Sequence, residues 1–72
     1  MRAETISAGD VLELKRGRAR AYGIDVPTVE VVRLKPRPGY LTPIVEGVYR
    51  ANARAAPANG FFAPSDFERR TP

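Results

Sequence analysis

The residues of this chain best suited to chemistry are cations that recur at every second position. Two such rows occur: Arg16, Arg18 and Arg20, and Arg33, Lys35 and Arg37. On an extended chain, residues two apart point to the same face. Because consecutive elements are commonly neighbours in space, we expect the two rows to join into one cationic ridge that contacts phosphate groups.

Residues beside the two rows add to this expectation. Lys15 precedes the first row, Tyr22 follows it, and Tyr40 follows the second row. Aromatic rings next to cations can stack on nucleic-acid bases. Two other interpretations stay open: the arginine segment is a solvated loop, and the tyrosines pack in the core or at its rim.

The first row also carries a motif resemblance. Its Arg16-Gly17-Arg18 sequence resembles the core of the AT-hook, which lies along the minor groove of A·T-rich DNA. Glycine lets the backbone approach the groove floor, while the arginines reach acceptors along it. The AT-hook has a proline after Arg-Gly-Arg, whereas this chain has Ala19. The resemblance implies a minor-groove or phosphate-binding finger. The glycines and the closing proline of residues 15–27 predict a long loop there, with an extended arm at 18–22.

The composition removes most catalytic and metal chemistry. The 72 residues contain no cysteine and no histidine, which excludes disulfides, thiolate or imidazole zinc sites, and serine–histidine or cysteine nucleophiles. The eight carboxylates are spread along the chain, without the pairing that a glycoside-hydrolase type of site needs. No glycine-rich phosphate loop is present. We therefore expect a protein that is not an enzyme and has no cofactor or metal site.

Charge and hydropathy indicate the setting of the protein. The net charge of +4 favours polyanionic partners. Abundant arginine, alanine, glycine and proline are also what a GC-rich genome produces, so we hypothesise a bacterial or phage origin. Residues 1–9 lack the pattern of a signal peptide, and no apolar run is long enough to span a membrane. We expect a cytoplasmic protein without membrane contact.

The hydrophobic pattern predicts a single all-β domain over residues 1–72. Alternation and β-branched residues predict strands at Val11–Leu14 and 28–34, and a turn at 36–39 follows. Residues 40–50 fit a strand best, although a helix over 43–56, which would make the fold α+β, remains the alternative. Asn59-Gly60 predicts a hairpin turn that ends a long loop over 51–59. The last two strands are then expected at 61–63 and 68–70.

The closing segment, residues 60–68, resembles the end of SH3 domains. There a strand runs through Pro-Ser-Asn-Tyr into one turn of 3₁₀ helix, and this chain has Pro64-Ser65-Asp66-Phe67. The resemblance implies a small SH3-like barrel of four to five antiparallel strands. The tryptophan and acidic loop of a peptide-binding SH3 groove are absent, and only Pro64 and Phe67 match that groove. We expect these residues in the core: Leu12, Leu14, Val29, Val31, Ile44, Val45, Phe62 and Phe67.

Two functions follow from these patterns. The first is a non-enzymatic module that binds nucleic acid through the arginine-rich ridge. The alternative is a protein-interaction or structural module, such as a small phage or bacterial assembly component. Its interface would be an apolar rim of Tyr40, Tyr49 and Phe61. The sequence leaves the oligomeric state unknown.

Overall fold

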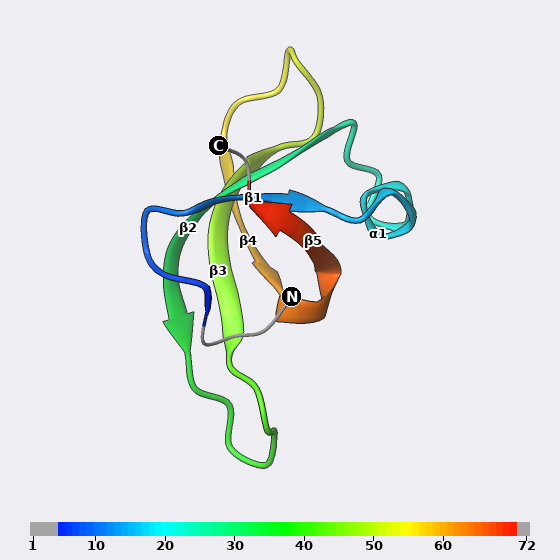
Figure 1. Cartoon of the computed structure of the whole chain (residues 1–72). Helices are drawn as coiled ribbons and strands as arrows, with labels where there is room; N and C mark the ends of the chain where they lie inside the picture. The colour runs from blue at the N-terminus through cyan, green and yellow to red at the C-terminus, as the bar shows by residue number, and fades with distance from the viewer. Residues whose placement is uncertain (1–4, 71–72) are drawn as a thin grey trace.

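One antiparallel sheet of five strands organises the computed structural model, which describes residues 5–70 (Figure 1). The strands are β1 (Val11–Leu14), β2 (Val26–Lys35), β3 (Ile44–Arg50), β4 (Ala58–Phe62) and β5 (Phe67–Arg70). Their order is β4-β3-β2-β1-β5, and hydrogen bonds do not close the sheet within the described residues. The prediction of a small all-β fold is confirmed, and the arrangement is compatible with an SH3-like fold. The ends of the predicted 1–72 domain lie outside the described residues.

Two short helices connect the strands. The six-residue helix α1 (Arg16–Ala21) lies between β1 and β2, and the 3₁₀ helix η2 (Pro64–Asp66) lies between β4 and β5. The predicted turn after the fourth strand is therefore present as η2. Within the described residues, no helix combines the length and the apolar character needed to cross a membrane.

Strand β2 is the longest element and bends the sheet around the core. Its first half pairs with β1, and it pairs with β3 from Val26 to Lys35. The register with β3 shifts between Val31 and Arg33, which leaves Val32 exposed on the outer side. Such irregularities bend a strand and increase its twist, so both halves of β2 can face the same core.

Residues 44–50 form strand β3, which decides between the two predictions for this segment. Glycine at position 47 disfavours both a strand and a helix, and the structure shows why glycine is needed there. It lies opposite Val31 in the ladder, and a Cβ at this position would overlap the Val29 side chain and come within 3.0 Å of the Glu30 carbonyl oxygen. Glycine therefore allows β2 and β3 to approach each other at the bend.

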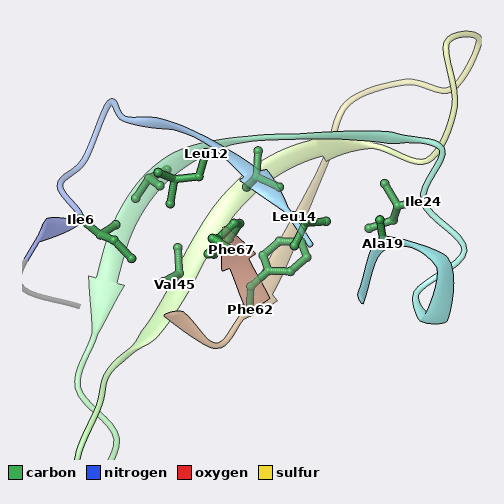
Figure 2. Packing of buried hydrophobic residues seen from close by; sticks show 10 residues of the cluster. Ile6, Leu12, Leu14, Ala19, Ile24, Val45, Phe62 and Phe67 are labelled. Atoms are coloured by element: carbon green, nitrogen blue, oxygen red, sulfur yellow. The ribbon is translucent and has the colours of Figure 1, made fainter. Parts of the chain in front are cut away.

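The core lies inside the curved sheet, and Ala19 and Ile24 beside α1 close one end of it (Figure 2). Seven of the eight predicted core residues are buried, whereas Ile44 is only half-buried. The rings of Phe62 and Phe67 meet edge to face, with their centroids 5.7 Å apart. Three further buried hydrophobic residues were not predicted: Ile6, Ala19 and Ile24.

Helix α1 corrects the prediction of a long loop with an extended arm. Arginine and alanine favour helix, and the helix ends in a Schellman motif. Gly23 has a φ of 71° and donates to the Arg20 carbonyl, while the Ile24 N–H donates to the Ala19 carbonyl at 2.8 Å. Burial of Ala19 and Ile24 supplies the apolar contact that accompanies this motif.

The predicted hairpin turn at Asn59-Gly60 is wrong. Both residues lie inside β4, paired with Val48 and Gly47, and the connecting loop covers residues 51–57. Gly60 has a different use: the Tyr49 ring packs so close that a Cβ at Gly60 would lie 2.7 Å from its Cε1. Close packing against a ring, and not a turn, requires this glycine.

Adjacent phenylalanines provide a matched test of this core. Phe62 is 4% exposed and Phe61 is 58% exposed. Phe62→Ala should lower the free energy of unfolding by about 3–5 kcal/mol, enough to unfold a domain of this size. Phe61→Ala should change it by less than about 1 kcal/mol. Urea melts of both variants measure the difference, and equal midpoints would show that the core is placed wrongly.

Candidate functional site

The structure divides the predicted cationic ridge into two groups. Helix α1 holds the first row beside the start of β2, whereas the second row lies at the end of β2 and in the loop beyond it. Nine residue steps at about 3.3 Å make the path along β2 roughly 30 Å long, and the molecule measures 35 Å along its longest axis. Figure 1 shows α1 and the β2–β3 hairpin tip well apart. The six cations therefore do not form one ridge.

In the first row, Arg18 is held by the buried carboxylate of Asp66. Its Nε lies 3.5 Å from Asp66 Oδ1. The Tyr22 hydroxyl donates to Asp66 Oδ2 at 2.9 Å, and this hydrogen bond is the main reason why the pKa of Tyr22 is raised above its usual 10.0. The Tyr22 ring also packs on Phe62, with centroids 6.1 Å apart. Arg18 and Tyr22 thus help to fix α1 on the core.

The other two arginines of α1 face a different surface. Arg16 and Arg20 are four residues apart, so they share one side of the helix. They line an open cleft of about 780 Å³. Its wall also contains three carboxylates: Glu13, Asp25 and Glu68. This mixture of charges makes the cleft a poor match for a polyphosphate chain.

Lys15 is exposed and immediately precedes α1. Its backbone N–H donates to the Asp66 carbonyl at 2.8 Å. The helical conformation of residues 16–18 also differs from the extended chain that the AT-hook resemblance requires.

In the second row, Arg33 is paired with a buried glutamate. Its Nε donates to Glu46 Oε1 at 2.7 Å, and Asn59 also donates to this carboxylate, at 3.5 Å. The register places Arg33, Glu46 and Phe61 side by side across β2, β3 and β4 on the outer face of the sheet. The hydrogen bond from Arg33 lowers the pKa of Glu46 below its ordinary 4.5, against the opposing effect of burial.

The remaining cations of the second row lie against exposed aromatic rings. The Lys35 ammonium is 5.5 Å from the Phe61 ring centroid, and the Arg37 guanidinium is 4.2 Å from the Tyr40 centroid. Neither cation forms an ion pair with a described carboxylate, although Lys35 is close enough to Glu46 to help lower its pKa. We call these four residues the basic–aromatic surface: Lys35, Arg37, Tyr40 and Phe61.

A defined turn holds the hairpin end of this surface. The Tyr40 N–H donates to the Arg37 carbonyl at 3.2 Å, Pro38 is the first central residue, and Gly39 has a φ of 82°. This is the pattern that a type II turn requires, and it confirms the turn predicted at 36–39. Arg37 also donates to the carbonyl and the hydroxyl of Thr42. These bonds orient its guanidinium over the Tyr40 ring.

The residues that sequence reasoning missed are the two acidic partners, Asp66 and Glu46. Both are 4% exposed, and both have a cationic partner. A signal for Glu46 exists in the strand pattern, because position 46 must point away from the core if Val45 points inward. Asp66 gives no comparable signal, because Arg18 in α1 and Tyr22 directly after it are more than 40 residues away in the chain.

Within the described residues, no cluster of His, Cys, Asp or Glu side chains could hold a metal ion. Comparison of the chain with protein-family models, curated proteins and solved structures finds no match.

The Arg33–Glu46 pair predicts an acid-sensitive contribution to stability. Because the pKa of Glu46 is lowered on folding, the pair stabilises fully above pH 4.5 and loses its effect as the pH falls through the lowered pKa. The stability lost in Glu46→Gln should therefore shrink when urea melts are repeated from pH 7 down to pH 2. Glu30→Gln, which removes an exposed glutamate of β2, controls for the change in net charge. A deficit in Glu46→Gln that stays constant down to pH 2 would contradict the ion pair.

Proposed function

We propose that the protein is a non-enzymatic module that binds single-stranded nucleic acid through the basic–aromatic surface. One observation carries the proposal. Tyr40 and Phe61 are 66% and 58% exposed, and each has a cation against its ring that no described carboxylate pairs. Exposed rings with adjacent cations are the arrangement with which proteins bind single strands without reading their sequence.

The chemistry divides between the rings and the cations. Bases of a single strand have free π-faces, so they can stack on the uncovered sides of Tyr40 and Phe61. Lys35 and Arg37 can turn from the rings to phosphates, because an exposed cation–π contact contributes only about 0.5–1 kcal/mol. A duplex keeps its base faces stacked internally. Single strands are therefore the favoured ligand.

The arginines of α1 support nucleic-acid binding less well. Arg18 already has Asp66 as its partner, and three carboxylates share the cleft with Arg16 and Arg20. Those carboxylates would repel phosphates. We therefore assign the binding role to the hairpin end of β2 and a structural role to Arg18.

A second candidate function rests on Leu41. This side chain is fully exposed next to Tyr40 in the β2–β3 loop. An aliphatic side chain contributes little to base stacking, whereas beside Tyr40 it extends an exposed apolar patch, and such patches mark protein-interaction sites. The same end of the molecule could therefore bind a protein, as expected of an interaction or assembly module.

The proposal predicts how affinity for a labelled oligothymidine depends on salt and on particular side chains. Log affinity should fall linearly with log salt, with a slope of about −0.7 for each phosphate engaged. Lys35→Ala with Arg37→Ala should make the slope shallower by about 1.4. Tyr40→Ala and Phe61→Ala should each weaken binding by about 1–3 kcal/mol, the contribution of one stacked base. Fluorescence anisotropy measures the salt slopes of the parent and the double variant and the affinities of the two aromatic variants.

The matched control is Arg16→Ala with Arg20→Ala, which removes the same charge from α1 and should leave the slope unchanged. An oligouridine of equal length compares RNA with DNA, and a hairpin duplex tests the preference for single strands. Loss of binding in the α1 control, or tighter binding of the duplex, would contradict the proposed surface. No binding at low salt would favour the protein-interaction function.

A further inference from the structure

Strand β4 is an open edge of the sheet. It stands first in the order β4-β3-β2-β1-β5 and pairs only with β3 among the described strands. The pairing runs without a register shift from Ala58 opposite Tyr49 to Phe62 opposite Val45. Alternate N–H and C=O groups of β4 therefore point away from β3 and are available to another strand.

The edge lacks the usual features that prevent strand pairing. Natural edge strands are blocked by charged residues, prolines or bulges. The five residues of β4 are Ala-Asn-Gly-Phe-Phe, with no charge and no proline, and the ladder to β3 is regular. The opposite edge, β5, differs, because it contains the exposed, charged residue Glu68. The open character of β4 is therefore specific to that side of the sheet.

A hollow of about 240 Å³ lies beside β4, on the inner side where the sheet is not closed. Its walls are mostly aromatic: Tyr22, Ile24, Tyr49, Gly60, Phe61 and Phe62. When a peptide adds a strand to a sheet edge, main-chain hydrogen bonds hold it, and pockets for alternate side chains select it. The hollow has room for an apolar side chain of such a strand.

The charges around β4 are unbalanced toward positive. Lys35 lies over Phe61, Arg50 ends the neighbouring strand, and Arg54 is exposed in the loop that leads into β4. The nearby carboxylates, Glu46 and Asp66, are buried and paired with arginines. A second copy of this chain, with net charge +4, would be repelled from this edge. An acidic strand would be attracted to it.

We propose that β4 binds an extended acidic segment of a partner protein as an additional strand. In a segment that alternates acidic and apolar residues, the two kinds of side chain point to opposite faces. One apolar side chain enters the hollow, and the acidic side chains on the other face meet the cations. This site shares Phe61 and Lys35 with the basic–aromatic surface. It differs in being held by the main chain of the β4 edge, so protection of the β4 amides tests it separately from the proposed nucleic-acid binding.

The test uses ¹⁵N-labelled protein and the peptide acetyl-(Glu-Val)₅-amide. Alternate amides of β4 should shift and gain protection from hydrogen exchange when the peptide is added. The peptide (Lys-Val)₅ should bind at least about tenfold more weakly, because its charge is reversed. Methylating every amide nitrogen of (Glu-Val)₅ should abolish binding while keeping its side chains.

Two charge reversals complete the test. Arg54→Glu should weaken binding of (Glu-Val)₅, whereas the matched Arg37→Glu, at the hairpin tip, should not. Four results would overturn the proposal: no β4 protection at millimolar peptide, equal binding of the methylated peptide, equal binding of (Lys-Val)₅, or equal effects of the two reversals. Protection of β4 without peptide, together with a doubled molecular mass, would show that a second copy occupies the edge.

Discussion

The buried carboxylate of Asp66 is the constraint on which the arrangement of this small domain depends. The carboxylate accepts hydrogen bonds from the Tyr22 hydroxyl and the Ala63 N–H, and it pairs with Arg18. The backbone carbonyl of Asp66 accepts a further hydrogen bond from the Lys15 N–H. A helix of six residues is not stable alone in water. Asp66 therefore holds α1 against the sheet, where Ala19 and Ile24 complete the core.

This constraint also separates structure from function in the chain. The carboxylate that fixes α1 pairs with Arg18 and accepts a hydrogen bond from Tyr22. Part of the most arginine-rich segment therefore has a structural role. The long strand β2 then carries the second row to the far end of the molecule, where Lys35 and Arg37 lie against exposed rings instead of carboxylates. The buried carboxylates of Asp66 and Glu46 thus pair with Arg18 and Arg33, whereas Lys35 and Arg37 at the hairpin end form no ion pair with a described carboxylate.

Local patterns were enough to predict most of the fold, because alternation and turn residues act over a few positions. The strands at Val11–Leu14 and in residues 28–34, the turn before Tyr40 and the η2 turn were all predicted. Helix α1 was missed because the two-residue spacing of its arginines was read as an extended chain, although Gly23 and Ile24 form a helix-ending signal. The turn predicted at Asn59-Gly60 was wrong for another reason. Packing of the Tyr49 ring against Gly60 overrides the turn preference of the Asn-Gly pair. The partners of Arg18 and Arg33 depend on long-range contacts, which no local pattern contains.

The central claim is that the hairpin end of β2, and not α1, binds single-stranded nucleic acid. Chemical-shift mapping of ¹⁵N-labelled protein, titrated with a ten-residue oligothymidine at low salt, tests it most directly. The account predicts shifts at Lys35, Arg37, Tyr40 and Phe61, with residues 16–20 unaffected. Shifts concentrated in residues 16–20, with none at the hairpin, would contradict it.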